Sequence, residues 1–181
     1  TSKGNIRRNK LTDFHNINVN GKIAMKLNSD DMLVNVVTCS ETDDIFLSTR
    51  LGKCIRFSCK DLRVFSGRSS VGVRGIKLSE KDAVISLAIL NGINFNVNER
   101  DEYLKISSAQ RKNEQIDQIN VSKDKINEFK DNEEFLLSVT DKGFGKRSSA
   151  YEYRKSNRGG LGIANMQLSQ RNGNEIIASF P

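Results

Sequence analysis

One pattern recurs three times along the chain, and this internal repeat limits the possible folds more than any other feature. The segments that carry it align without a gap: GKIAMKLNSDDMLVNVV from Gly21, GVRGIKLSEKDAVISLA from Gly72 and GIANMQLSQRNGNEIIA from Gly162. Each segment has a leucine and then an acid or amide at matching positions: Leu27, Leu78 and Leu168, then Asp31, Asp82 and Asn172. Such a recurrence indicates an array of like structural units.

A second shared element precedes each of these segments. In SKGNIRR, RLGKCIRF and DKGFGKRS, a glycine is followed four residues later by an arginine: Gly4 and Arg8, Gly52 and Arg56, Gly143 and Arg147. A tight turn between twisted strands needs a positive φ, which glycine adopts without a Cβ penalty, so turn chemistry explains the glycines. It does not explain the arginines.

The order of these elements predicts an all-β fold. The apolar stretches DIFLST and EFLLSVT precede the second and third glycine turns, so a complete unit reads as four short strands in about 45 residues, the size of a propeller-type blade. Only 36% of the residues are hydrophobic and tryptophan is absent, which suits a thin core between short strands. We expect four-stranded antiparallel blades arranged as in a propeller.

The repeat also predicts the domain organisation. We expect one β-domain with a partial blade at 1–43, a blade at 44–90, an insertion at 91–133 and a blade at 134–181. Ile116, Ile119, Ile126 and Phe129 are spaced as on a short amphipathic helix, so we expect the insertion to be partly helical. The first copy starts past its first strand, and three blades do not easily close a ring, so we expect a fragment of a longer protein.

Charge is distributed unevenly along the chain. Residues 1–90 hold 15 Lys and Arg against 9 Asp and Glu, residues 134–181 hold 7 against 4, and residues 91–133 hold 7 against 9. The basic excess therefore lies on the repeats, where it indicates a polyanionic partner or a merely solvated basic surface. The acidic insertion is not expected to contact DNA; it is either a solvated excursion or a docking site.

Catalytic and metal-binding motifs are absent from the sequence. His15 is the only histidine, and Cys39, Cys54 and Cys59 lack the paired spacing of a zinc site, so we expect buried, reduced cysteines and no metal. RGGLG, in Ser156–Gly162, is only a weak phosphate motif, and no lysine follows it as in a P-loop. We expect no catalytic residue in this segment and, with no membrane span or signal peptide, a cytoplasmic protein.

Three stretches resemble consecutive blades of a known family. DIFLSTRLGKCIRF, GRSSVGVRGIKL and DKGFGKRSSAYEYRKSNRGGLGI are similar to the C-terminal domain of the DNA gyrase A subunit, from the bacterial type II topoisomerases. The resemblance covers 1–90 and 134–181. The family's hallmark box, QRRGGKG, is absent, and SNRGGLG at Ser156–Gly162 is the nearest stretch. In this family the catalytic tyrosine lies in the other half of the polypeptide, so Tyr103, Tyr151 and Tyr153 are not nucleophile candidates.

The resemblance implies a β-pinwheel, in which neighbouring blades exchange strands and the basic outer rim wraps double-stranded DNA. It implies an A2B2 holoenzyme with the gyrase B subunit, in which ATP and Mg²⁺ act outside this segment and drive negative supercoiling. Sequence-independent wrapping needs cations that meet phosphates at regular intervals. The candidate rim cations are Arg7, Arg8, Lys10, Lys53, Arg56, Arg68, Arg74, Lys77, Lys146, Arg147, Arg154, Lys155 and Arg158.

Two other functions fit the repeats. The related C-terminal domain in the A subunit of topoisomerase IV also consists of such blades, although GVRGIKL favours gyrase. A propeller-like protein-interaction module would carry exposed aromatic or apolar anchors, whereas these blades carry Lys and Arg.

Overall fold

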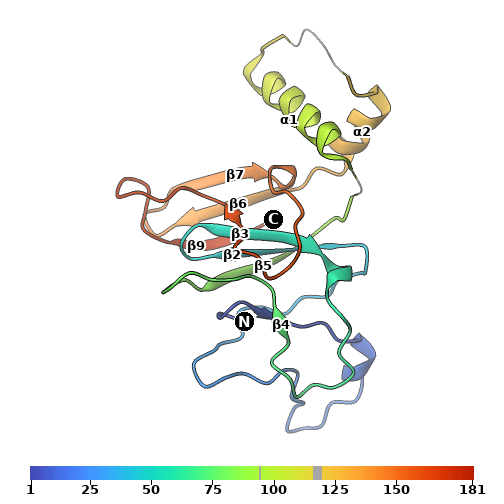
Figure 1. The fold of residues 1–181 in the computed structure, drawn as a ribbon, viewed down its shortest axis with the longest axis vertical. Helices are drawn as coiled ribbons and strands as arrows, with labels where there is room; N and C mark the ends of the chain where they lie inside the picture. The colour runs from blue at the N-terminus through green and yellow to red at the C-terminus, as the bar shows by residue number, and fades with distance from the viewer. Residues whose placement is uncertain (94, 116–119) are drawn as a thin grey trace.

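The computed structural model describes residues 1–93, 95–115 and 120–181. Over these residues the strands form three antiparallel sheets, and two α-helices project from one end of the molecule (Figure 1). The strands are β1 (Asn5–Ile6), β2 (Asp44–Thr49), β3 (Lys53–Ser58), β4 (Val73–Arg74), β5 (Val84–Leu90), β6 (Phe135–Thr140), β7 (Gly145–Ser149), β8 (Ile163–Ala164) and β9 (Ile176–Phe180). The helices are α1 (Val97–Lys112) and α2 (Lys123–Asp131), with short 3-10 turns η1 (Leu11–Phe14), η2 (Cys59–Asp61) and η3 (Ala150–Glu152).

Neighbouring repeats exchange a strand. We call the ranges 1–43, 44–90 and 134–181 the first, second and third units. The central sheet has the order β5-β2-β3-β8, and its last strand comes from the third unit. In the same way β4, from the second unit, pairs with β1 of the first. The four strands of the central sheet therefore do not come from one unit, and we call the β1–β4 pairing the first junction and the β3–β8 pairing the second.

Glycines at positive φ make the turns and the exchange possible. Gly4, Gly52 and Gly143 have φ between 78° and 85°, which confirms them as turn residues. Gly162, at φ +71°, begins the exchanged strand, and a Cβ there would overlap the carbonyl oxygen of Cys54 in the second unit. Gly72 is placed in the same way against Ile6. The aligned glycines thus let two backbones approach closely.

The gap-free alignment of the third copy is wrong at its turn. Thr49, the last residue of β2, pairs with Val84, twelve residues after Gly72. Its counterpart Thr140 pairs with Ile176, which lies fourteen residues after Gly162. The third turn is therefore two residues longer than the second, because it takes up the additional loop around Gly173.

The central sheet is covered on both faces, so all six residues of β2 are buried. Ile45 and Leu47 point into one apolar cluster together with Ile55 and Ile76. Phe46, between them on β2, points to the other face and belongs to a cluster with buried residues of the third unit. This packing fixes the position of the junctions relative to one another.

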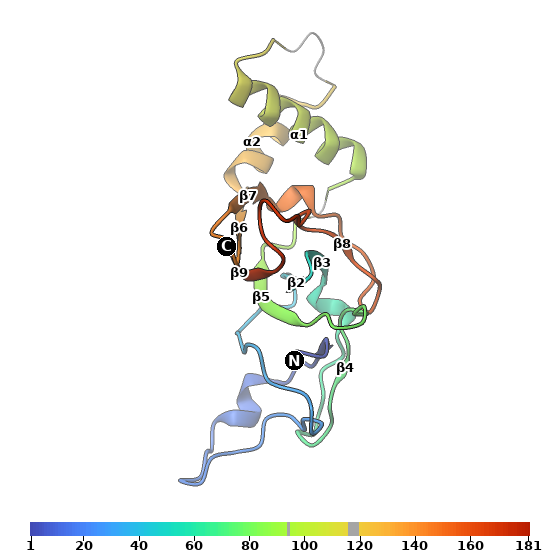
Figure 2. The same cartoon turned by 90° about the vertical axis from the view of Figure 1, so that its left-hand side faces the viewer.

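The insertion is a helical hairpin held by an aromatic cluster. Asn96 caps α1 with a capping box. The Phe129 ring of α2 lies 5.0 Å from that of Tyr103 in α1 and 5.2 Å from that of Tyr151 in η3. The two helices lie side by side beyond β7 (Figures 1 and 2). The expected helix is thus present around Ile126 and Phe129, and Ile116 and Ile119 lie outside the described residues. None of the helices in the described ranges is long and apolar enough to cross a membrane.

Candidate nucleic-acid interface

Arg56 is buried inside the sheet and does not lie on a rim, so this part of the predicted set is corrected. Its side chain is 1% exposed. Its Nε donates to Asp44 Oδ2 at 2.8 Å, and Nη2 lies 2.8 Å from the same oxygen. Nη1 donates to the Ala150 carbonyl oxygen at 2.8 Å. Lys155, a second candidate, places its Nζ 3.1 Å from the same Asp44 oxygen. Both cations neutralise an internal carboxylate, and Arg56 has no surface to offer a phosphate.

Arg147 occupies the matching position of the third unit but is exposed. Its guanidinium lies 3.7 Å from the centre of the Phe135 ring. Phe135 stands eight residues before Gly143, as Asp44 stands eight before Gly52. The position of the acid that pairs with buried Arg56 is therefore occupied by an aromatic residue in the third unit. A ring face attracts a cation without removing its charge, so Arg147 remains available to an anion.

Arg8, the third member of the glycine–arginine pattern, is intermediate. Its side chain is 16% exposed, and Nη1 lies 3.6 Å from a Glu41 carboxylate oxygen. Nη1 also lies 3.5 Å from the Cys59 sulfur. The glycine–arginine pattern therefore places an arginine at the same position of each unit. The neighbouring side chains decide how far that arginine is exposed.

The loop 156–162, which leads into the second junction, lies against β4 of the first junction and brings together three predicted cations from distant parts of the sequence. Arg158 Nη1 donates to the carbonyl oxygen of Arg74 at 3.1 Å, and its Nε donates to that of Asp61 at 3.1 Å. The Lys77 amide donates to the Gly160 carbonyl oxygen at 2.8 Å. No ion pair joins Arg74, Lys77 or Arg158 to an acid within the described ranges. The loop and β4 therefore form a cationic surface held in shape by backbone contacts.

The first junction has a similar arrangement around Phe65. The Arg7 guanidinium lies 4.8 Å from the centre of the Phe65 ring and donates to the Ser70 carbonyl oxygen at 2.8 Å. Arg63 lies 4.3 Å from the same ring. Sequence reasoning missed Arg63, although its place two residues before Phe65 puts both side chains on one side of an extended segment. Arg68 lies four residues before Gly72, as Arg158 lies before Gly162, so both loops carry arginine at one repeat position.

The remaining candidates are spread over the surface. Lys146 lies 3.9 Å from a Glu152 carboxylate oxygen and donates to the Asn165 carbonyl oxygen at 3.2 Å. Three others are exposed and form no ion pair within the part of the chain that the structure describes: Lys10, Lys53 and Arg154. A DNA-binding role for all the surface members of the set stays a prediction.

Comparison with known proteins places this geometry in a family. The sequence matches the family model described as "DNA gyrase C-terminal domain, beta-propeller" over residues 1–40, 43–91 and 134–180. The chain belongs to this family of gyrase C-terminal domains. It is 47% identical over 202 residues to the DNA gyrase A subunit of Granulibacter bethesdensis, an alignment that covers 100% of the chain and 22% of that relative.

Other gyrase A subunits match over nearly the same range. Identity to the Rickettsia typhi protein is 46%, covering 96% of the chain and 20% of the relative, and identity to the Staphylococcus epidermidis protein is 33%, covering 97% and 15%. The chain thus spans 15–22% of the length of these curated relatives.

Two solved structures share the fold of this gyrase C-terminal domain. The C-terminal domain of DNA topoisomerase IV superposes with a TM-score of 0.69 at 18% identity, covering 98% of the chain and 43% of that structure. The DNA gyrase A C-terminal domain gives 0.63 at 21% identity, covering 97% and 44%. The propeller-type fold expected from the repeats is confirmed, with two helices added.

The glycine-rich loop of the gyrase C-terminal domain, Ser156–Gly162, forms backbone hydrogen bonds to the second unit. The Gly159 amide donates to the Gly75 carbonyl oxygen at 2.5 Å, and the Ser156 amide donates to that of Arg56 at 2.9 Å. These amides are therefore occupied by backbone acceptors and do not line a cradle for a phosphate. In the ranges that the structure describes, no group of three or more His, Cys, Asp or Glu side chains could hold a metal ion.

The cysteines of this gyrase C-terminal domain should differ sharply in reactivity. Partial burial of its sulfur, and then a hydrogen bond with the Cys59 sulfur 3.4 Å away, raises the pKa of Cys39 to about 11, and burial raises the pKa of Cys54 to about 12. Because the thiolate is the nucleophile, we expect exposed Cys39 to react slowly with a disulfide reagent at pH 7 and about tenfold faster for each pH unit up to 9. A thiol titration with and without urea tests this. Rapid native reaction of Cys39 at pH 7 would contradict it.

Proposed function

We propose that this chain binds double-stranded DNA through the phosphate backbone, and that it bends the duplex along the two strand-exchange junctions. The observation that carries the proposal is the repeated placement of cations there. Arg68 and Arg158 hold the same position in their loops, and Arg74 and Lys77 accompany Arg158 with no acidic partner among the described residues. Repetition supplies phosphate contacts at a regular spacing, as a bent duplex requires.

The proposed contact is independent of base sequence. Reading bases requires a helix or ribbon whose side chains reach base edges in the major groove. The helices of this chain, α1 and α2, lie in the acidic insertion and project beyond the sheet β7-β6-β9, away from β1 (Figure 1). Bending 20 to 30 base pairs by 40 to 90° costs roughly 1–6 kcal/mol, so several phosphate contacts are needed to offset it.

Within the whole protein, we assign this segment to the introduction of negative supercoils by gyrase in the bacterial cytoplasm. The proposal puts the gyrase B subunit and the rest of the gyrase A polypeptide in an A2B2 assembly around it, with ATP and Mg²⁺ acting outside this segment. Membership of the gyrase family and the 46–47% identity to gyrase A subunits support this assignment over topoisomerase IV. The structural similarity to both C-terminal domains concerns the fold alone.

Charge reversal where the 156–162 loop meets β4 should weaken DNA binding strongly. We expect the variant Arg74→Glu, Arg158→Glu to lose about tenfold or more in affinity for a duplex at about 50 mM salt. The slope of log K against log salt should also become shallower by about 2, since each phosphate contact contributes about 0.9. Fluorescence anisotropy at a series of salt concentrations measures both quantities.

A matched control separates this surface from overall charge. The variant Lys105→Glu, Lys123→Glu makes the same charge change at exposed positions of α1 and α2, and we expect it to keep the parent slope. Equal losses in both variants would mean that net charge alone governs affinity, and the loop and β4 would not be the binding surface.

An assay of the linking number of a plasmid tests whether the chain wraps DNA. Ligation of a nicked circular plasmid in the presence of the chain should leave a positive shift in linking number if DNA is wrapped in a right-handed sense. Tight binding with an unchanged linking number would support phosphate contact and overturn the bending.

A further inference from the structure

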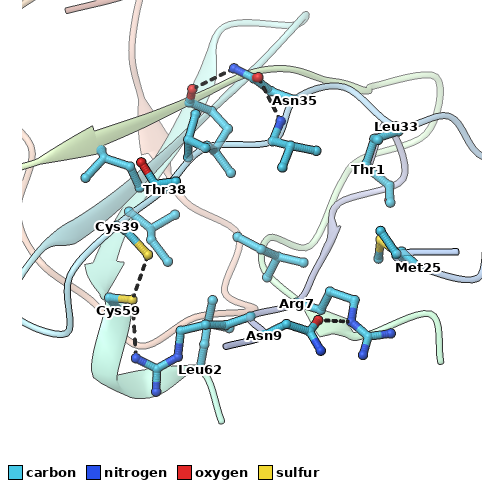
Figure 3. Close-up of a pocket in the computed structure, with 18 of the residues that line it drawn as sticks. Thr1, Arg7, Asn9, Met25, Leu33, Asn35, Thr38, Cys39, Cys59 and Leu62 are labelled. Atoms are coloured by element: carbon cyan, nitrogen blue, oxygen red, sulfur yellow. Dashed lines mark hydrogen bonds between the residues drawn. The ribbon is translucent and has the colours of Figure 1, made fainter. Parts of the chain in front are cut away.

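Two of the three cysteines lie in contact although they belong to different units. The Cys39 sulfur lies 3.4 Å from the Cys59 sulfur, and the two side chains point toward one another in a pocket beside the central sheet (Figure 3). Cys39 lies near the end of the first unit, and Cys59 begins η2 of the second unit. Both are free thiols. The contact therefore places two oxidisable groups across the boundary between two units.

The contact belongs to the regular packing of one unit against the next. In the gap-free alignment of the first two copies, Cys39 corresponds to Leu90, the last residue of β5. Cys59 corresponds to Ala150, because each stands seven residues after its turn glycine. Leu90 and Ala150 belong to one buried apolar cluster. The two cysteines thus occupy the positions of two apolar residues in the packing between the second and third units.

The surroundings give the two sulfurs different roles. Cys39 is exposed, whereas Cys59 is fully buried. Nη1 of Arg8 lies 3.5 Å from the Cys59 sulfur and 3.6 Å from a Glu41 carboxylate oxygen. Burial, and then Cys59 and Asp43, raise the pKa of Cys39 to about 11, and the charge of Arg8 acts in the opposite direction. Cys39 is therefore the thiol that a reagent reaches, and Cys59 is the thiol that lies within reach of the product.

We propose that a soluble disulfide such as oxidised glutathione converts Cys39 and Cys59 into a disulfide that joins the first unit to the second. The Cys39 thiolate attacks one glutathione sulfur, the S–S bond of the reagent breaks, and one glutathione thiolate leaves. The Cys59 sulfur loses its proton and attacks the Cys39 sulfur, which releases the second glutathione thiolate. The chain gives up two electrons and two protons, and oxidised glutathione becomes two molecules of the thiol.

The disulfide fastens the first unit to the loop that carries the first junction. The Phe65 amide, six residues after Cys59, donates to the Arg8 carbonyl oxygen at 2.8 Å. A disulfide bond is about 2.0 Å long, so the sulfurs must approach by about 1.4 Å. Residues 33–40 form no helix or strand, so this segment can supply the movement. The cross-link closes a ring around β2 and β3, and we expect it to stabilise the oxidised chain.

Peptide mapping after oxidation tests the proposal on the 181-residue chain. The chain is incubated with oxidised glutathione, its remaining thiols are alkylated, and trypsin then places the three cysteines on separate peptides, 27–50, 54–56 and 57–60. We expect 27–50 joined to 57–60, with 54–56 alkylated. The rate should rise about tenfold for each pH unit between about 7 and 9, and dithiothreitol should restore both thiols.

Three variants separate the two steps of the reaction. Cys59→Ser should keep one glutathione on Cys39 as a mixed disulfide, because no second thiol displaces it. Cys39→Ser should stay unmodified while folded, because Cys54 and Cys59 are buried. Cys54→Ser is the matched control and should form the same cross-link as the parent chain. Amide exchange at residues 59–65 should slow about tenfold in the oxidised parent but not in glutathione-treated Cys59→Ser.

Four outcomes would overturn the proposal. They are no modification of the parent chain at about pH 9, a cross-link that includes Cys54, a mixed disulfide on Cys39 that persists in the parent, and a dimer of chains linked through Cys39. The parent chain alone distinguishes these outcomes by its peptide map, so the test holds even if a serine at the buried position 59 impairs folding.

Discussion

Replacing Arg56 with alanine is expected to lower the free energy of unfolding by about 3–5 kcal/mol. The side chain is 1% exposed and shares the Asp44 carboxylate with Lys155. Its loss leaves a cavity, reduces the positive charge around a buried carboxylate, and removes the donors to the carbonyl oxygens of Ala150 and Asn91. Urea unfolding followed by tyrosine fluorescence measures the change, since the chain has three tyrosines and no tryptophan.

Arg147→Ala provides the matched comparison at the same position of the repeat. It removes an exposed cation above Phe135, an interaction of about 0.5–1 kcal/mol, so unfolding should change little. We expect the opposite order for DNA affinity: Arg147→Ala weakens it, and the folded fraction of Arg56→Ala keeps it. Equal stability of the two variants would refute a structural role for Arg56.

The second large effect is expected for Gly162→Ala, which should destabilise the chain by roughly 2–5 kcal/mol. The backbone at φ +71° costs a non-glycine residue about 1–2 kcal/mol, and overlap of the new Cβ with the Cys54 carbonyl oxygen adds about 1–3 kcal/mol. Because β8 must move away from β3, amide exchange should also increase at residues 53–54 before global unfolding.

Gly21→Ala separates the two causes. Gly21 has φ +79°, close to that of Gly162, but nothing lies within 4 Å of an added Cβ. Only the backbone cost of about 1–2 kcal/mol should remain. If Gly162→Ala were no more harmful than Gly21→Ala, the tight approach at the second junction would not be an important contribution to stability.

The sequence was sufficient to predict the fold because the repeats place glycine wherever the backbone needs a positive φ. Gly52 and Gly143 marked the hairpins, and DIFLST and EFLLSVT marked the strands that precede them. The longer third turn escaped prediction because Asn172 still aligns with Asp82, and only strand pairing shows where the register resumes.

The site was predictable only in part, because exposure depends on cross-strand neighbours. Arg56 and Arg147 are equivalent in the sequence pattern. They differ because the diagonal neighbour on the adjacent strand is Asp44 in one unit and Phe135 in the other. The contact of Arg158 with Arg74 likewise depends on the exchange, which joins residues far apart in the chain.

The exchanged strand has a consequence for how the chain is made. The central sheet gains its last strand, β8, only after Ile163 and Ala164 have been synthesised, about 74 residues after β5 ends at Leu90. At 5–20 residues per second, the ribosome needs roughly 4–15 s to cover that distance. During this interval the outer edge of β3 is open on the nascent chain, so the first and second units each receive a strand from the unit translated next.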